Sequence, residues 1–422
     1  MTNTLIVGFE RGKAPAYDDV VRSLRDRAIG DWNALENTFQ GITIEPHFKI
    51  DTRFVPENDS SGLRTFFKLN VPLAFDENKV ASMMREWPEV LHTYRPPRLR
   101  PAADDWTDYH DFPKQEHLHE WPRGMNVPSA WGHLGGDGEC ESIAVLEIGW
   151  SDHDDLDWKN IEVVGKNSPT DTDMNHGMMT LGVIAATGNP DGSVGMNPRF
   201  AALTLYGLHE SNGWVLSDHI REAADQLPPG SVILIEAELY DTKGPVELVP
   251  DVFAAIDYAV AQRSQVVIEP AGNGGRDLAS FTEETGVANS DYPLLGYKED
   301  SDADSGAVMV GACSSMLPHT RMGNSNAGER VDCYAWGNDV YTVNSIYEGT
   351  SAASAIVAGC ASSIQGIHQA ADHSRLPPKD VRALLKEPTL GNVVEVPMYQ
   401  ASTMPDLEKI IDGGLTLPQI PA

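Results

Sequence analysis

Short apolar runs alternate with helical segments through most of the chain after residue 140. The apolar runs lie at 143–148, 162–164, 201–205, 232–235, 266–268 and 307–312. The segments with helical character lie at 176–187, 216–226, 251–263 and 351–369. Buried runs of this length, separated by helices, are typical of parallel strands that are covered on both faces. The pattern predicts an α/β fold with a doubly wound, mostly parallel sheet and helices on both faces.

Residues 1–100 follow a different pattern and form a separate unit. We expect strands at 5–9, 65–71 and 90–94 and helices at 18–28 and 77–87. This order, with antiparallel pairing, predicts a small N-terminal α+β sandwich domain. The proline-rich and then acidic, aromatic segment 101–126 predicts a linker. The larger domain would then span 127–390, with a C-terminal extension at 391–422 that packs on it.

Charge and composition narrow the classes of function. The chain has 422 residues, of which 62 are acidic and 31 basic, for a net charge of −31. So acidic a chain argues against nucleic acid or an anionic membrane as a partner. No stretch approaches the roughly 20 apolar residues of a membrane span, and residues 1–11 lack the features of a secretory signal. We expect a monomer, located in the cytoplasm or secreted by a non-classical route.

The cysteines do not indicate a metal site. Cys140, Cys313, Cys333 and Cys360 show no CxxC spacing, so the sequence gives no sign of zinc. Reduced, buried thiols are the default interpretation. Cys313 and Cys333 flank one loop on neighbouring strands, and their pairing stays open.

The segment 349–359 places a serine at the start of a buried helix. Gly349 permits a tight turn, Thr350 and Ser351 stand where a helix N-cap would stand, and small apolar residues follow. The hydroxyl and the backbone N–H of Ser351 would then lie at the positive end of the helix dipole. That position suits a nucleophile whose attack creates an oxyanion. Taken alone, the segment is better explained as an ordinary N-cap serine on a buried helix.

Three other segments supply partners for this serine. Glu147 ends an apolar run, His176 opens a small-residue helix, and Asn273 lies in a glycine-rich turn after another apolar run. A carboxylate, an imidazole, an amide donor and a hydroxyl are the parts that acyl transfer requires. Asp152 and Asp154 are rivals for the acid, but they lie past the strand in a polar loop.

Together the four segments resemble the subtilisin-like serine peptidases (subtilases, peptidase family S8). That family has an Asp-x-Gly strand end, a His-Gly helix, an Ala-Gly-Asn turn and a Gly-Thr-Ser-x-Ala helix in this chain order. Segments 194–198, 310–312 and 325–328 also match family motifs, and the resemblance covers roughly 127–390. It implies a serine endopeptidase with a triad of Glu147, His176 and Ser351 and with Asn273 in the oxyanion hole. Where most members have Asp, this chain has Glu147, which is one methylene longer.

The resemblance also bears on partners and cofactors. It implies a protein or peptide substrate and a propeptide-like N-terminal domain that acts as an intramolecular inhibitor or chaperone; a permanent accessory domain is the alternative. No metal or organic cofactor is required. Structural calcium occurs in the family, but no Asp-x-Asp-x-Asp-Gly loop is present here, and Asp302, Asp304, Asp171 and Asp173 have only weak support as ligands.

The substrate-binding residues are expected on both sides of one cleft. The candidates are Glu236, Ala237, Glu238, Glu269, Ala271 and Gly272. A carboxylate in an apolar strand is costly unless it is paired or faces water. Three carboxylates near one pocket favour a basic P1 residue of the substrate or a bound cation. Pairing with Arg or Lys, or exposure to solvent, is an equally good explanation.

Two other functions stay open. A catalytically inactive or latent subtilase-like module would keep the fold and bind protein without cleaving it. A serine esterase of the α/β-hydrolase type would need Gly-x-Ser-x-Gly and the chain order serine, acid, histidine, and the sequence has neither.

Overall fold

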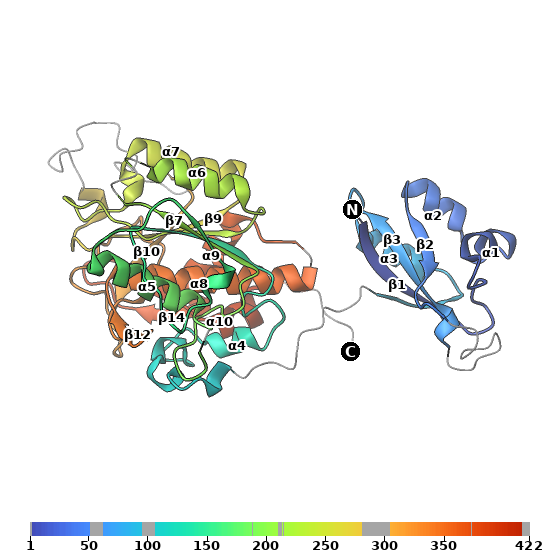
Figure 1. The fold of residues 1–422 in the computed structure, drawn as a ribbon, viewed down its shortest axis with the longest axis horizontal. Helices are drawn as coiled ribbons and strands as arrows, with labels where there is room; N and C mark the ends of the chain where they lie inside the picture. The colour runs from blue at the N-terminus through green and yellow to red at the C-terminus, as the bar shows by residue number, and fades with distance from the viewer. Residues whose placement is uncertain are drawn as a thin grey trace. The chain divides into compact units, whose positions relative to one another are not determined.

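The computed structural model describes residues 2–50, 62–94, 106–187, 189–209, 213, 215–280, 304–372 and 374–415. The chain divides into two compact units, Met1–Pro101 and Ala102–Ala422 (Figure 1). Among the described residues, each unit has its own hydrophobic core.

The first unit is an antiparallel sheet with three helices in its described part. The strands β1 (Thr2–Phe9), β2 (Thr43–Pro46), β3 (Phe66–Pro72) and β4 (Val90–Tyr94) pair in the order β2-β3-β1-β4. The helices are α1 (Val20–Asp26), α2 (Trp32–Thr38) and α3 (Glu77–Arg85). Alternate residues of β3 are buried, among them Phe67 and Leu69, as a strand with one covered face requires. The predicted α+β domain is confirmed, although the sequence pattern missed α2 and β2.

The second unit is built on a parallel sheet of seven strands within the described residues. Its order is β11-β10-β9-β8-β5-β7-β6, and every pairing in it is parallel. The strands are β5 (Ser142–Glu147), β6 (Ile161–Val164), β7 (Ala202–Gly207), β8 (Val232–Ile235), β9 (Val266–Pro270), β10 (Val308–Cys313) and β11 (Cys333–Trp336). The predicted parallel sheet is confirmed, and β11 is the strand that the pattern missed.

Helices cover both faces of this sheet. On one face lie α5 (Asp171–Ala185) and α8 (Thr350–Asp372), and on the other α6 (Leu216–Gln226) and α7 (Pro250–Asp257) (Figure 1). Within β5, Ile143 and Val145 belong to the first core, and Ala144 and Leu146 to the second. This alternation follows from the period of two along a strand, and it confirms the doubly wound arrangement.

The remaining elements of the second unit lie around this core. They are α4 (Val127–Trp131), α9 (Pro378–Lys386), α10 (Leu407–Lys409), the hairpin of β12 (Val340–Thr342) and β13 (Ser345–Tyr347), and the hairpin of β14 (Gly391–Val394) and β15 (Ser402–Pro405). Met404 and Leu407 of the predicted C-terminal extension are fully buried in the main core.

Residues 102–126 of the segment predicted as a linker belong to the second unit. Its described part contains Trp106, Tyr109, Leu118 and Met125, which are buried in the main core. The boundary therefore falls after Pro101 and not at residue 126. The proline and acidic residues of this segment made it look like a solvated connection, but its apolar side chains are spaced so that short helical turns can bury them.

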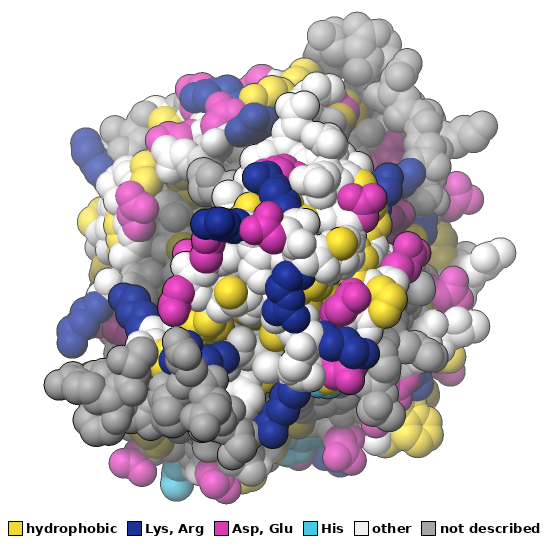
Figure 2. Space-filling model, turned by 90° about the vertical axis from the view of Figure 1, so that its right-hand side faces the viewer, with side chains coloured by type: hydrophobic (Ala, Val, Ile, Leu, Met, Phe, Trp, Pro, Cys, Tyr) yellow, Lys and Arg dark blue, Asp and Glu magenta, His cyan; other side chains and the backbone are white. Residues whose placement is uncertain are grey.

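The surface, the helices and the cysteines bear on the remaining predictions from the sequence. On the face shown in Figure 2, acidic and basic side chains are intermixed with apolar ones. Within the described ranges, no helix has both the length and the apolar content that a membrane crossing requires. All four cysteines are free thiols, and Cys313, Cys333 and Cys360 are buried, so the structure does not pair Cys313 with Cys333.

Candidate active site

Two buried carboxylates lie side by side at one edge of the main sheet. Strands β5 and β8 are parallel neighbours, with Leu146 opposite Ile235. The next residues along the two strands are Glu147 and Glu236, which are 1% and 2% exposed. The carboxyl ends of parallel strands are the usual place for a binding site in such a sheet.

His176 meets Glu147 from the first half of α5. Its Nδ1 lies 2.9 Å from Glu147 Oε2. A Cβ at the following residue, Gly177, would lie 2.5 Å from the Glu147 Cγ and 1.9 Å from the carbonyl oxygen of Gly149. Only glycine therefore allows the helix to approach the strand end so closely.

Further donors hold the Glu147 carboxylate. The backbone N–H of Ile148 donates to Oε1 at 2.8 Å, and the Thr180 hydroxyl, one turn after His176, donates to Oε2 at 3.1 Å. The rival acids Asp152 and Asp154 are exposed in the loop that follows. Glu147 is thus the carboxylate that the structure brings to His176.

The charges around His176 favour its protonated form. Burial lowers the pKa of the imidazole, but the charge and hydrogen bond of Glu147 outweigh burial, and Glu236 and Asp173 act in the same direction as Glu147. The net result raises the pKa of His176 to about 9. With both Glu147 and Glu236 charged, the neutral imidazole that a general base requires therefore becomes abundant only in the alkaline range.

Ser351 stands at the start of α8, close to these groups. Gly349 precedes the helix with φ of 89°, in the left-handed region that favours glycine. The Ser351 hydroxyl interacts with the Glu236 carboxyl and with the Tyr347 hydroxyl. The Tyr347 hydroxyl in turn lies 3.2 Å from His176 Nε2. Among the described residues no hydrogen bond joins His176 directly to Ser351. The structure therefore brings the predicted triad residues together, but the hydrogen bond between the imidazole and the serine hydroxyl is not formed.

Asn273 lies in the turn after β9 and contacts the same helix start. Its Oδ1 accepts from the backbone N–H of Thr350 at 3.0 Å. Its Nδ2 and backbone N–H both donate to Glu238 Oε2, at 2.9 and 2.8 Å. The amide that was predicted to stabilise an oxyanion is thus bound to a carboxylate of this chain.

The predicted substrate-binding residues fall into two groups. Glu238 is half-buried beside Asn273, which follows the buried Ala271 and Gly272, whereas Ala237 is half-buried and packs against the core on the α6 and α7 side. Glu236 is buried against Ser354, whose hydroxyl donates to its Oε1 at 2.8 Å. Glu238 also pairs with Lys243 at 3.1 Å.

Glu269 lies elsewhere, which corrects its prediction as a substrate-binding residue. It is fully buried, and its Oε2 accepts from the backbone N–H of Glu247 at 3.4 Å. Burial and the nearby charge of Glu247 raise the pKa of Glu269 well above its usual range. Its side chain follows Val267, which faces α6 and α7, whereas Glu147 and Glu236 follow residues that face α5 and α8.

Four further residues support the site and were not predicted. Thr180, Tyr347 and Ser354 contact Glu147, His176 and Glu236 as described above. Asn326 is buried under the Asn273 turn, where its Nδ2 donates to the carbonyl oxygens of Lys243 and Ala271, each at 2.7 Å. The Ser-Asn-x-Gly match pointed to Asn326, and the spacing of four residues from His176 could have pointed to Thr180. No sequence signal distinguishes Tyr347.

Two sets of side chains bear on metal binding. Glu147, His176 and Glu236 offer three ligand atoms that lie within 4.8 Å of one another. Of the weak calcium candidates, Asp304 pairs with Arg382 and Asp173 accepts from Ser168, while Asp302 lies outside the described residues. These contacts supply no separate argument for calcium.

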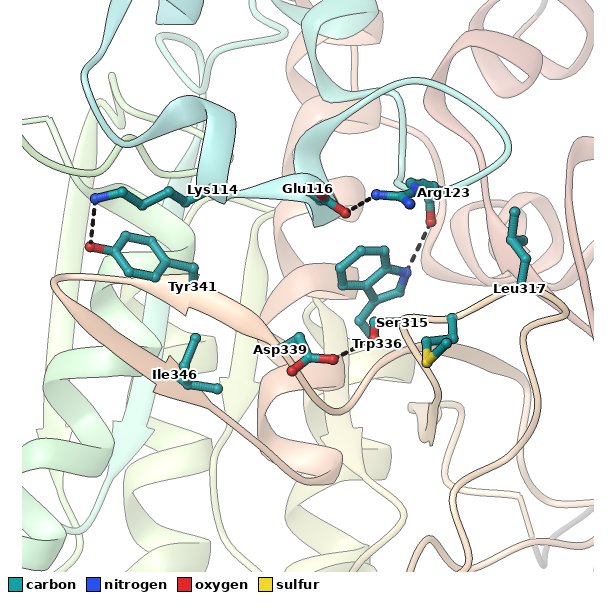
Figure 3. Close-up of a pocket in the computed structure, with 10 residues that line it drawn as sticks. Lys114, Glu116, Arg123, Ser315, Leu317, Trp336, Asp339, Tyr341 and Ile346 are labelled. Atoms are coloured by element: carbon teal, nitrogen blue, oxygen red, sulfur yellow. Dashed lines mark hydrogen bonds and ion pairs between the residues drawn. The ribbon is translucent and has the colours of Figure 1, made fainter.

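A pocket of about 610 Å³ lies on the second unit, away from these residues (Figure 3). Its charged rim includes Lys114, Glu116 and Arg123, and the Trp336 indole donates to the Arg123 carbonyl oxygen at 2.9 Å. None of the predicted site residues lines this pocket.

Comparisons with known proteins agree with the fold. A family model described as the subtilase family matches residues 103–398. An intracellular serine protease of Paenibacillus polymyxa is 28% identical over 309 residues, which are 67% of this chain and 85% of that protein. A solved protease structure from Pseudoalteromonas arctica has a TM-score of 0.51 at 20% identity, covering 72% of this chain and 98% of that one. At this identity, the structural likeness speaks for the fold alone.

Proposed function

The chain belongs to the subtilase family and is a serine-type endopeptidase, and we propose that Glu147, His176 and Ser351 form its catalytic triad. The observation that carries this proposal is the 2.9 Å contact between the Glu147 carboxylate and His176 Nδ1, next to the start of the Ser351 helix. A buried carboxylate on Nδ1 fixes the tautomer in which Nε2 can accept a proton.

The proposed reaction proceeds through an acyl-enzyme. Ser351 Oγ attacks the scissile carbonyl carbon, and His176 Nε2 accepts the hydroxyl proton. His176 then donates that proton to the departing amine, and water hydrolyses the ester by the same two steps. Glu147 stabilises the imidazolium throughout. Before attack, His176 Nε2 must exchange its contact with Tyr347 for one with Ser351, a tightening that bound substrate commonly brings about.

We assign oxyanion stabilisation to Asn273 Nδ2 and to the backbone N–H of Ser351. The latter lies in the first turn of α8, where helix N–H groups are free to bind an anion. The carbonyl oxygen of the substrate would displace Glu238 from Asn273 Nδ2. The Asn273 amide would then donate to the Glu238 carboxylate before the reaction and to the oxyanion during it.

Glu238 also supports a preference for a basic P1 residue. Its carboxylate is 22% exposed beside Asn273, and its cationic partner Lys243 is 46% exposed. A P1 Lys or Arg could take the place of Lys243 without leaving a buried charge unpaired.

We further propose that the N-terminal domain acts as an intramolecular inhibitor or chaperone. Sequencing of the N-terminus of the mature protein tests this proposal.

A latent, protein-binding form is the second candidate. It is favoured by the contacts of His176 Nε2 with Tyr347 and of Asn273 Nδ2 with Glu238, which occupy both groups that catalysis needs. In that form the chain would bind proteins without cleaving them.

A fluorophosphonate probe distinguishes the two candidates. An activated serine reacts with it, so we expect labelling of Ser351 in the wild-type chain and none in Ser351→Ala. Casein cleavage is the second readout. Lack of both labelling and cleavage, in a folded protein from pH 6 to 10, would favour the latent form.

A further inference from the structure

Glu236 is a buried acid beside the triad that the reaction described above does not use. It is 2% exposed, and its backbone N–H donates to the Leu146 carbonyl oxygen at 2.9 Å, which holds it next to Glu147. An oxygen of each carboxylate and a ring nitrogen of His176 lie within 4.8 Å of one another. One imidazole nitrogen therefore lies close to two buried carboxyl groups.

The two carboxyl groups are hydrogen-bonded very differently. Glu147 accepts from Ile148, Thr180 and His176, so both of its oxygens have partners. Glu236 accepts from Ser354 at Oε1 and its carboxyl also interacts with the Ser351 hydroxyl, but its Oε2 is buried and has no hydrogen-bond partner in the described structure. Donors stabilise a carboxylate, and burial without donors favours the neutral acid.

These differences in hydrogen bonding indicate which of the two carboxyl groups, Glu147 or Glu236, is ionised. Two carboxylates this close to each other cannot both ionise without cost, and the better-solvated one ionises first. We propose that Glu236 holds a proton in the reactive enzyme, so that His176 is neutral and free to accept the Ser351 proton. In this inference, which rests on the proposed function, Glu236 is a positioning residue that acts through His176 and Ser351.

One proton is thus shared between Glu236 and His176. When it lies on Glu236, the imidazole can act as a base; when it lies on His176, the base is lost. Burial raises the pKa of Glu236 well above its usual range, the charge of His176 lowers it, Glu147 raises it, and the hydroxyls of Ser354 and Ser351 lower it. The groups that face the pair are Glu147 on β5, Asp173 on α5 and Tyr347 on β13.

The shared proton predicts a bell-shaped pH profile. At low pH both groups are protonated and the base is blocked. As pH rises, the first proton leaves and activity appears. When the second proton leaves, the Glu236 carboxylate places a negative charge beside the developing oxyanion, and activity falls. The two midpoints belong to the pair and not to either residue.

Glu236→Gln tests this directly. The experiment measures kcat/KM of the full-length chain on one peptide substrate from pH 5 to 11, with EDTA present to exclude divalent cations. About one pH unit beyond the upper midpoint, the wild type should retain about a tenth of its maximum. Glu236→Gln, which has no second group to lose a proton, should stay on a plateau there.

Glu269→Gln is the matched control. Glu269 is also a buried acid just after an apolar strand run, and its Oε1 has no hydrogen-bond partner in the described structure, but it faces Glu247 instead of His176. This variant should keep the alkaline fall. Circular dichroism at each pH separates loss of activity from unfolding.

Ser354→Ala provides a second test that does not alter Glu236 itself. It removes the 2.8 Å hydrogen bond to Oε1 that stabilises the ionised form. The alkaline midpoint should therefore move up by about one pH unit. This variant decides the matter if Glu236→Gln does not fold.

The outcomes separate the inference from the function beneath it. An active wild type whose alkaline fall survives in Glu236→Gln, or whose midpoint does not move in Ser354→Ala, overturns the role of Glu236 alone. A wild type without an alkaline fall up to pH 11 does the same. A folded wild type that is inactive at every pH overturns both proposals.

Discussion

Two clusters of buried carboxylates belong to the same parallel sheet, and they are balanced in opposite ways. In the first, Glu147 and Glu236 share the imidazole of His176; the ion pairs of the described residues give them no Lys or Arg. In the second, Arg330 donates to both oxygens of Glu247 at 2.7 and 2.8 Å and to Asp332 at 3.1 Å. We refer to these as the imidazole cluster and the guanidinium cluster.

The difference shows which cluster can take part in chemistry. A guanidinium group keeps its charge at every accessible pH, so the guanidinium cluster neutralises its carboxylates permanently. An imidazole gains or loses its proton within the working range, so the imidazole cluster can pass a proton to and from a hydroxyl. Breaking the first cluster should cost stability, and breaking the second should cost activity.

Glu147→Gln should produce the largest effect on activity. The amide keeps the shape of the side chain but cannot stabilise an imidazolium or fix the tautomer of His176. We expect kcat to fall by about 10⁴-fold, measured by steady-state hydrolysis of a peptide substrate. Glu269→Gln, with the same chemical change next to Glu247 of the guanidinium cluster, is the control. A fall of less than tenfold in Glu147→Gln would remove Glu147 from the triad.

Arg330→Met should have the largest effect on stability. It leaves Glu247 buried without its cation, whereas Asp332 keeps its ion pair with Arg382 at 2.9 Å. The uncompensated Glu247 charge is expected to lower the free energy of unfolding by about 3–5 kcal/mol. Urea denaturation monitored by tryptophan fluorescence measures this loss. The activity per folded molecule should remain, because Arg330 donates to Glu247, Asp332, Ser305 and Ala307, none of which belongs to the proposed triad.

Arg221→Met is the matched control for that variant. Arg221 pairs with Asp225 at 2.8 Å on the surface of α6, where its side chain is 54% exposed. An exposed pair one helical turn apart contributes little to the free energy of unfolding, because water screens both charges. Equal losses in the two arginine variants would mean that burial does not distinguish the guanidinium cluster.

Stability should also respond to acid through the guanidinium cluster. Burial raises the pKa of Glu247 and of Asp304, but the arginines outweigh burial and leave both pKa values below the ordinary range. A lowered folded-state pKa contributes stability above the unfolded-state pKa, and this contribution disappears as pH falls through the folded-state value. Arg330→Met should therefore show a smaller loss of stability between pH 6 and 3 than the wild type does.

The sequence predicted the sheet and the gathering of Glu147, His176, Ser351 and Asn273, but not the difference between the two clusters. Glu236 and Glu269 each accompany an apolar run, and the pattern treated them alike. Their separation depends on strand order and on the period of two along each strand, because Glu236 points to the α5 side and Glu269 to the opposite side. The sequence of one strand shows neither its neighbours in the sheet nor which of its two faces points toward α5 and α8.

The same limit applies to residues that come from distant parts of the chain. Tyr347 reaches His176 because the β12–β13 hairpin leads into α8, and Glu238 reaches Asn273 across two neighbouring strand ends. Such contacts arise from side-chain conformations that no spacing rule encodes. By contrast, Gly177 and Gly349 could be interpreted locally, since a tight approach or a turn requires glycine whatever lies around it.

Asn273→Ala sharpens the account of the imidazole cluster with an intermediate effect. Loss of one oxyanion donor is expected to lower kcat by about 10²–10³-fold with little change in KM. Asn326→Ala is the control, because Asn326 supports the turn from below and should mainly lower the melting temperature. A large rise in KM for Asn273→Ala would instead indicate that Asn273 binds the substrate in its ground state.

Glu238→Ala should have the smallest effect, and it tests whether the edge of the imidazole cluster selects substrates by charge. A partly exposed ion pair contributes about 1 kcal/mol, so the ratio of kcat/KM for P1 Arg over P1 Leu should fall about fivefold. Lys243→Met should move the ratio in the opposite direction, because it removes the cation that a basic P1 residue must replace. Peptides that differ only at P1 measure both ratios. If the ratio of kcat/KM for P1 Arg over P1 Leu changes in neither variant, the Glu238 carboxylate serves only to hold the Asn273 turn. Its role would then be structural, like that of the carboxylates of Glu247 and Asp332 around Arg330.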